Sequence, residues 1–428
     1  MDNVLRRRSL RLAAALAALG LMASVAGCNA IDAEVTTLKV IAADYNLTGG
    51  DTRSTENYWA ELARAYEAEH PRVRIDVQVE PWSDVEGKVA DMVKEGKAPD
   101  IAQIGTYADY AAAGKLYSAD ELLAVPVQAN FLPALAEAGE RTGTLYGIPF
   151  AASTRSLFYN KKLFSDAGIQ RPPTSFEGLA DAVEKLKENN VLYPIALPLA
   201  PEDAQYELMM WLLSGGGGYT SETGRYTIDS TSNIKTLDWI KENLVEKELT
   251  GPVSPQKLSR SDALAAFVRG EVGLVSAPPS LLRDAEKNGV RVGRVTLEGP
   301  DGREAAGVGA ADWIMGFKQN GHREEIGDFL NFVFTDKNVL DFTGRSDLLP
   351  VTVSAGEAME EDPKRRHLRE FLQRIPESRF PPMNKPSWAH VSRDIRMSMG
   401  EAFTPRTSPA SVLVKINRDA VQHEMGSR

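Results

Sequence analysis

The segment Arg72-Val73-Arg74-Ile75-Asp76-Val77-Gln78-Val79 decides the fold class. Its apolar residues alternate with polar ones, so it predicts a β-strand with one buried face. A helical pattern over 55–70 precedes it, and an apolar strand over 38–42 comes before that helix. Strand and helix patterns continue to alternate along the chain, which predicts an α/β protein.

Toward the N-terminus, the sequence has the pattern of an export signal. Arginines at 6, 7, 8 and 11 precede an apolar run over 12–26 that is too short to span a bilayer with ordinary flanks. The run ends in Ser24-Val25-Ala26-Gly27-Cys28, which resembles the lipobox of bacterial lipoproteins. We therefore expect residues 1–27 to be a cleaved signal peptide, Cys28 to be lipidated, and 28–36 to form a tether.

Lipidation at Cys28 implies an extracytoplasmic protein anchored to the cell membrane. Two acyl chains on one cysteine supply the two signals that stable anchoring needs. The alternative is a buried cysteine after an ordinary signal peptide, and the arginine pattern leaves both the general and the twin-arginine export routes open.

Composition narrows the class of protein. Cys28 is the only cysteine, so the chain forms no internal disulfide. A formal net charge of −10 argues against a nucleic-acid partner. The length exceeds what one small core requires and favours two lobes.

From residue 38 onward the chain resembles the family 1 extracellular solute-binding proteins, the maltose-binding-protein-like group. The resemblance rests on the collinear order of short segments at 59–71, 98–101, 114–116, 145–150, 157–164, 172–174 and 267–273. Leu348-Leu349-Pro350 and Trp388 also have counterparts.

The resemblance implies a periplasmic-binding-protein-like type II fold, in which two α/β lobes are joined by crossing hinge strands. It places the N-terminal lobe at 37–150 plus 311–345 and the C-terminal lobe at 151–306 plus 352–428. The hinges would lie near 149–151, 307–310 and 345–351. The implied function is to bind a sugar between the lobes and deliver it to the permease of an ABC importer, as a monomer and without catalysis.

Sugar binding needs aromatic rings for the pyranose C–H faces and forked polar groups for the hydroxyl rim. The expected ligand-binding residues follow strand ends, predicted hinges and the family positions: Asp44, Tyr45, Gln103, Thr106, Tyr107, Ser153, Arg155, Tyr219, Asp312, Trp313 and Trp388. Arg155 has the alternative of pairing with an acid across the cleft, and Trp388 that of a structural role. Trp82 is interpreted as a packing residue.

Other chemistry has little support in the sequence. The run Gly215-Gly216-Gly217-Gly218 is not followed by Lys-Ser/Thr, so it is not a P-loop. The five histidines show no metal-ligand spacing, and no catalytic motif appears, so we expect no metal, cofactor or catalytic residue. The alternatives are a binder of a polyol, polyamine, phosphorylated polyol or ferric ion, and a secreted glycoside hydrolase.

Overall fold

The computed structural model describes residues 35–45 and 54–426. Cys28, the predicted signal peptide and most of the predicted tether lie outside these residues. Within the described part of the chain, no helix is long and apolar enough to cross a membrane.

One mixed sheet runs through the molecule in the order β2-β1-β3-β10-β6-β8-β7, with β9 also pairing with β6. β1 pairs in parallel with β2 and β3, β10 is antiparallel to both β3 and β6, and β7 is parallel to β8. The strands of this sheet are β1 (Thr36–Ala43), β2 (Val73–Glu80), β3 (Ile101–Ile104), β6 (Ile148–Asn160), β7 (Tyr193–Ala196), β8 (Val272–Ala277), β9 (Val292–Val295) and β10 (Val308–Gly316). The predicted α/β class is confirmed.

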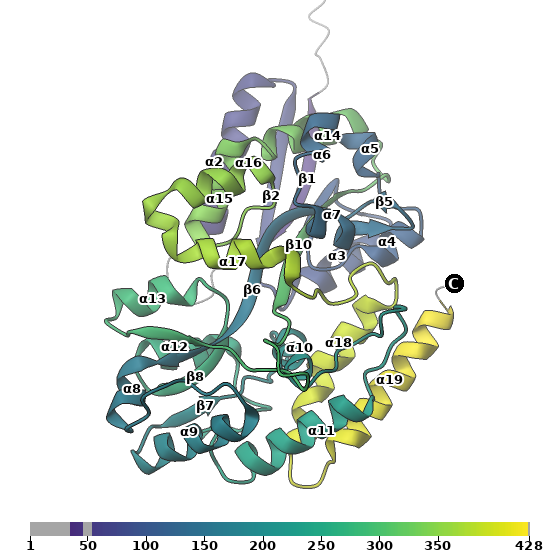
Figure 1. Cartoon of the computed structure of the whole chain (residues 1–428). Helices are drawn as coiled ribbons and strands as arrows, with labels where there is room; N and C mark the ends of the chain where they lie inside the picture. Colours follow the sequence, from purple (N-terminus) through teal and green to yellow (C-terminus); the bar gives the residue numbers. More distant parts are fainter. Residues whose placement is uncertain (1–34, 46–53, 427–428) are drawn as a thin grey trace, which may run out of the picture.

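The strand β6 runs from the upper to the lower part of the molecule (Figure 1). Its first half pairs with β10, and its second half pairs with β8 and β9. It ends at Asn160, whose side chain accepts a hydrogen bond from the Lys162 backbone N–H at 3.0 Å and begins the next helix. β6 therefore contributes to both lobes of a periplasmic-binding-protein-like type II fold, called the first and the second lobe below.

Segments at the three predicted hinges lie side by side. Ala152 of β6 pairs with Ala311 of β10, and it also forms an isolated bridge with Leu349. The ladder shifts register between Asp312 and Trp313, opposite Pro149, which has no N–H to donate. That these segments act as hinges remains a prediction.

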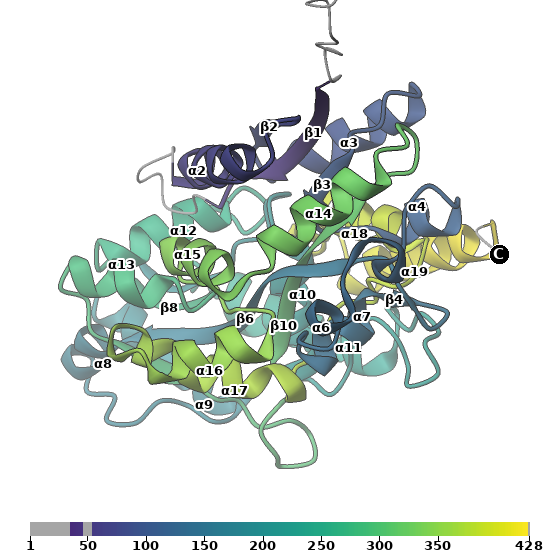
Figure 2. The same ribbon diagram turned by 90° about the horizontal axis from the view of Figure 1, so that it is seen from above.

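The first lobe packs its helices around β1, β2 and β3 (Figures 1 and 2). Helix α2 buries Tyr58, Trp59, Leu62, Ala63 and Tyr66 against the core, and the sequence pattern predicted four of them, Trp59, Leu62, Ala63 and Tyr66. The helices of this lobe are α2 (Ser54–Glu69), α3 (Val85–Lys94), α4 (Ala108–Ala112), α5 (Ala119–Leu122), α6 (Val125–Gln128), α7 (Pro133–Gly139), α14 (Arg323–Val333), α15 (Asp336–Ser346) and α16 (Val353–Glu361). A hairpin of β4 (Glu140–Arg141) and β5 (Thr144–Leu145) lies beside them.

The second lobe packs its helices around β7, β8 and β9 (Figure 1). They are α8 (Lys161–Asp166), α9 (Phe176–Glu188), α10 (Ala204–Ser214), α11 (Thr231–Ile240), η1 (Lys241–Val245), α12 (Arg260–Val268), α13 (Leu281–Lys287), α18 (Trp388–Ser398), η4 (Met399–Phe403) and α19 (Pro409–Gly426). The segment η2 (Pro363–Leu368), α17 (Arg369–Arg374) and η3 (Ile375–Glu377) leads from the first lobe to the second.

The predicted start of the last C-lobe segment, at residue 352, needs correction. Thr352 forms a bridge with Phe131, and the Asn130 side chain donates a hydrogen bond to Ser354 at 2.7 Å. These contacts hold α16 against the first lobe. The chain therefore returns to the second lobe only after this helix.

Candidate ligand-binding site

A cavity of about 120 Å³ lies between the two lobes. The first lobe contributes Tyr45, Trp82, Glu86 and Thr106 to its wall, and the crossing segments contribute Ser153, Thr154, Arg155, Ala310 and Asp312. The second lobe contributes Glu202, Asp203, Gln205, Tyr206, Arg260, Trp388 and Arg396. Both lobes thus contact whatever occupies this space.

Asp312 is held by a chain of hydrogen bonds from the first lobe. Tyr45 donates its hydroxyl to Asp312 Oδ2 at 2.7 Å, and Gln103 Nε2 donates to the same tyrosine oxygen at 2.8 Å. Gln103 is itself fixed because its Oε1 accepts the Ala43 N–H at 3.0 Å. Burial raises the pKa of Asp312 to about 7, while the Tyr45 bond and Arg260 oppose the shift.

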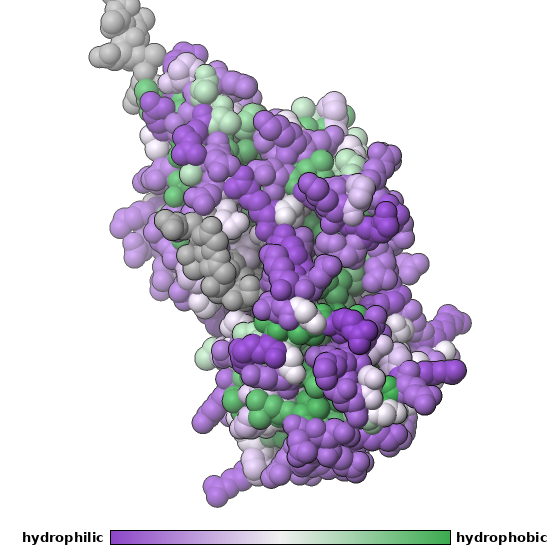
Figure 3. Space-filling model, turned by 90° about the vertical axis from the view of Figure 1, so that its left-hand side faces the viewer, coloured by the Kyte–Doolittle hydropathy of each residue, from purple (hydrophilic) through white to green (hydrophobic). Residues whose placement is uncertain are grey.

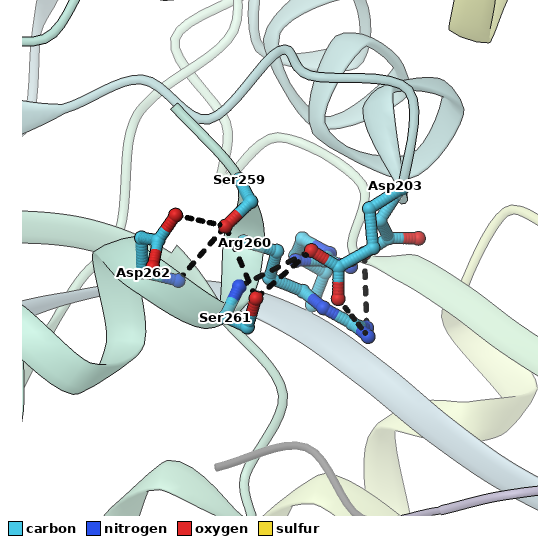
Figure 4. Close-up of polar contacts among 7 residues, drawn as sticks. Asp203, Ser259, Arg260, Ser261 and Asp262 are labelled. Atoms are coloured by element: carbon cyan, nitrogen blue, oxygen red, sulfur yellow. Dashed lines mark hydrogen bonds and ion pairs between the residues drawn. The ribbon is translucent and has the colours of Figure 1, made fainter. Parts of the chain in front are cut away.

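Arg155 and Arg260 converge on Asp203 in the second lobe. Both guanidinium groups donate to Asp203 Oδ2, Arg260 at 3.2 Å, and Arg260 also donates to Glu202 at 3.2 Å. Figure 4 shows Arg260, the first residue of α12, beside Asp203. Ser259 caps α12, because its hydroxyl oxygen accepts a hydrogen bond from the Asp262 N–H. Each buried charge in this cluster therefore has a partner, which burial demands.

An ion pair at the cavity joins the two lobes. Arg396 on α18 donates to Glu86 Oε2 on α3 at 3.3 Å. Burial raises the pKa of Glu86, and Arg396 acts against that shift.

Aromatic side chains complete the wall. Trp82 meets the ring of Tyr45 edge-on, with centroids 5.6 Å apart. On the opposite lobe, Trp388 packs against Tyr219 at 5.3 Å, and the Arg155 guanidinium lies 6.0 Å from the Tyr206 ring centroid. Aromatic surface from both lobes thus faces the cavity.

Several buried polar atoms on the wall have no hydrogen-bond partner. They are Thr154 Oγ1, Gln205 Oε1, Arg260 Nε and Arg396 Nε. An unpaired buried donor or acceptor costs roughly 1–3 kcal/mol, so these groups favour a polar ligand that satisfies them.

The model of the family described as bacterial extracellular solute-binding protein matches residues 49–339. This chain belongs to that family. A putative binding protein of Brucella abortus is 25% identical over 406 residues, covering 93% of this solute-binding protein and 94% of the relative. A maltotriose-binding protein of Pyrococcus abyssi is 31% identical over 189 residues, 43% of this chain and 39% of that one.

Solved structures agree on the fold. The GacH receptor of Streptomyces glaucescens, whose structures include an acarbose complex, superposes with a TM-score of 0.75 at 20% identity. The alignment covers 92% of this solute-binding protein and 99% of the receptor.

Six of the predicted ligand-binding residues line the cavity of this solute-binding protein: Tyr45, Thr106, Ser153, Arg155, Asp312 and Trp388. The other five do not: Asp44, Gln103, Tyr107, Tyr219 and Trp313. Gln103 and Tyr219 lie directly behind it, because one binds Tyr45 and the other packs on Trp388. Asp44 is half-buried and donates its backbone N–H to the Glu80 carbonyl at 2.8 Å.

Tyr107 and Trp313 belong to the core of the first lobe. Tyr107 donates its hydroxyl to the Ala138 carbonyl at 2.9 Å, and its ring meets Trp313 at 5.4 Å. Along β10, Ala310 and Asp312 are partly exposed at the cavity, whereas Ala311 and Trp313 are buried. The strand alternation therefore assigns Asp312, and not Trp313, to the site.

The sequence analysis missed Glu86, Glu202, Asp203, Gln205, Tyr206, Arg260 and Arg396, and it assigned Trp82 to packing alone. One signal was available: residues 202–206 follow β7 and begin α10, and the carboxyl ends of strands carry ligand sites in open α/β sheets. Nothing in the sequence marks Arg396, which reaches the cavity only through the packing of α18.

The glycine run has a packing role in the structure. A Cβ at Gly215 would overlap Thr236, and one at Gly217 would overlap the side-chain oxygen of Asn233, so α10 and α11 approach closely here. Among residues 35–45 and 54–426, no group of three or more His, Cys, Asp or Glu side chains could hold a metal ion.

Proposed function

We propose that this protein captures a sugar in the cavity between its lobes and passes it to the permease of an ABC importer. One observation carries the proposal: aromatic rings from both lobes, together with unpaired buried polar atoms of the second lobe and of β6, surround one cavity. Rings match the C–H faces of a sugar, and the polar atoms match its hydroxyl rim.

We infer that the lobes move apart to admit a sugar. The cavity of about 120 Å³ is smaller than the roughly 150 Å³ engineered cavity that holds benzene. Hinge motion at the three adjacent crossing segments would open it, and ligand contacts on both walls would favour closure.

The comparisons support this class of ligand. The maltotriose-binding relative and the acarbose-binding receptor both take oligosaccharides or analogues, and the family is one of solute binders.

The geometry argues against catalysis by a carboxylate pair. Glu86, Glu202 and Asp203 each bind an arginine, and Asp312 accepts from Tyr45. A glycoside hydrolase needs two carboxyl groups that flank the scissile bond, and three of these four groups are bound to arginines. We infer that the sugar leaves unchanged; detection of a hydrolysis product would refute this.

We also propose that Cys28 carries a lipid anchor and that the anchored protein is a monomer. The lipobox-like residues 24–28 support the anchor. Wild-type protein should partition into the detergent phase and the membrane fraction, and Cys28→Ala should lose both. A Cys28→Ala protein that stays with the membrane would contradict the anchor, and a concentration-independent dimer in light scattering would contradict the monomer.

The direct test is a thermal-shift screen of the purified protein against mono- and oligosaccharides, followed by calorimetric titration of each hit. A ligand at 100 times its Kd stabilises the folded state by about 2.7 kcal/mol, which raises Tm by several degrees. Arg155→Met should abolish the shift, and the remote exchange Lys162→Met should keep it. A panel without any shift would refute sugar binding.

A further inference from the structure

The charged groups on the cavity wall do not balance. The described lining residues include three guanidinium groups, those of Arg155, Arg260 and Arg396. They also include four carboxyl groups, those of Glu86, Glu202, Asp203 and Asp312.

All three arginines are already matched. Arg155 and Arg260 share Asp203, Arg260 also binds Glu202, and Arg396 binds Glu86. Three guanidinium groups and three carboxylates thus form two separate ion-pair clusters on the wall, and each cluster has equal numbers of positive and negative groups. Counted by charge, these residues leave no cation unmatched for an anionic ligand, although Arg260 Nε and Arg396 Nε still have no hydrogen-bond acceptor.

Asp312 is the carboxyl group left over. Among the described residues, the hydroxyl of Tyr45 donates one hydrogen bond to its Oδ2. A carboxylate accepts about four hydrogen bonds, so most of its acceptor capacity is unused. Asp312 faces the cavity from β10, beside Ala310.

The surroundings of Asp312 suit a cation that also has an apolar face. Tyr45, Trp82, Tyr206 and Trp388 line the same cavity, and aromatic faces attract ammonium groups. Thr154 Oγ1 and Gln205 Oε1 remain unpaired on the wall and can bind hydroxyl groups. One carboxyl group without an arginine partner among the described residues, ring faces and hydroxyl partners therefore occur together.

We propose that the ligand is a sugar or related polyol bearing one protonated amine, which binds to the carboxylate of Asp312. This inference rests on the proposed sugar-binding function and narrows it. A linear polyamine would need several free carboxylates, and a phosphorylated polyol would bring negative charge beside Asp312. The observed pairing disfavours both.

Proton release would accompany such binding. Burial raises the pKa of Asp312 to about 7, with Glu86 and Asp203 adding to the shift and Arg260 opposing it, while Tyr45 donates a hydrogen bond and Tyr206 lies nearby. An ammonium group favours the ionised carboxylate, so below pH 7 the bound Asp312 loses its proton.

The experiment uses matched trios of ligands: a neutral hexose, its 2-amino-2-deoxy form and the corresponding N-acetyl form, in the gluco, galacto and manno series. Calorimetry at pH 6.5, on the full chain in detergent, measures Kd for each member. For at least one trio, the amine should bind about tenfold or more tightly than both neutral forms, because charge-assisted hydrogen bonds are stronger. Titration in buffers of different ionisation enthalpy should detect proton release for the amine alone.

Two variants test the role of Asp312. Asp312→Asn should reduce the ratio of neutral to amine Kd to about one and remove the proton release. Asp91→Asn makes the same exchange at an exposed position on α3 and should keep both.

The outcomes separate the two proposals. Neutral sugars that bind as tightly as their amines would overturn this inference and leave the proposed function intact. Tighter binding of putrescine or sn-glycerol 3-phosphate than of any sugar would overturn both. The absence of binding by every trio would also contradict both.

Discussion

Arg396 and Glu86 lie 310 residues apart in the sequence, and their side chains meet at 3.3 Å across the two lobes. Arg396 belongs to α18 of the second lobe, and Glu86 belongs to α3 of the first. Since both side chains line the cavity, this ion pair helps to hold the lobes together over the binding site.

Breaking the ion pair should weaken closure. Arg396→Gln and Glu86→Gln should each lower ligand affinity, and a double-mutant cycle on the ligand Kd should give a coupling of about 0.5–1 kcal/mol that shrinks with added salt. Lys88→Gln, which removes an ion pair within the first lobe, is the matched control and should show no coupling to Arg396. Additive effects of Arg396→Gln and Glu86→Gln would contradict the role of the pair.

Tyr45→Phe should destabilise the protein by about 1–2 kcal/mol in urea unfolding, because Gln103 Nε2 and Asp312 both lose a buried partner. It should also raise the pKa of Asp312 further, since the hydroxyl bond lowers that pKa in the wild type. Carboxyl ¹³C NMR measures the second effect. Tyr206→Phe removes a cavity hydroxyl that has no such bond to Asp312, and an equal pKa change in that variant would count against the assignment.

Glu207 should make the free protein less stable as the pH rises. Burial raises its pKa to about 7 from a usual value of 4.5, so the folded state holds a proton that the unfolded state releases. The stabilisation from that proton is complete below pH 4.5 and disappears as the pH approaches 7, a loss of about 3 kcal/mol.

In the wild type, Trp211 Nε1 donates a hydrogen bond to Glu207 Oε1 at 2.8 Å. Glu207→Gln keeps an oxygen acceptor for this bond, but the amide does not titrate. Its unfolding free energy should therefore change less between pH 4.5 and pH 7 than that of the wild type. Part of the pH dependence of the unfolding free energy should remain in Glu207→Gln, because Asp312 titrates in the same pH range. Parallel pH profiles for the two proteins would disprove a titrating Glu207.

Trp82 and Trp313 should respond differently to truncation. Trp82→Ala should raise the ligand Kd by about tenfold with a small change in Tm, because this ring lines the cavity and is only partly buried. Trp313→Phe should lower stability by about 2 kcal/mol and leave Kd within twofold, because Trp313 is fully buried in the core. The reverse pattern would place Trp313 in the site.

The outer surface gives little further guidance to function. The face in Figure 3 is mostly hydrophilic, and its hydrophobic atoms form small separate areas. Isolated apolar side chains of this kind are normal on the surface of a folded protein.

The sequence alone determined the α/β class and the family. Those features depend on local patterns, such as the alternation over 72–79 and the collinear family segments, which a linear reading contains. It also identified six residues of the cavity wall, because they lie beside strand ends or crossings.

Only the tertiary structure decided which of Asp312 and Trp313 faces the cavity and which charges are left unmatched. The first depends on the register of β10 between β3 and β6, and the second depends on α10, α12 and α18 bringing Asp203, Arg260 and Arg396 to one wall. Pairing of charges is a property of distance in space, so no pattern along the chain could show that Asp312 has no arginine partner among residues 35–45 and 54–426.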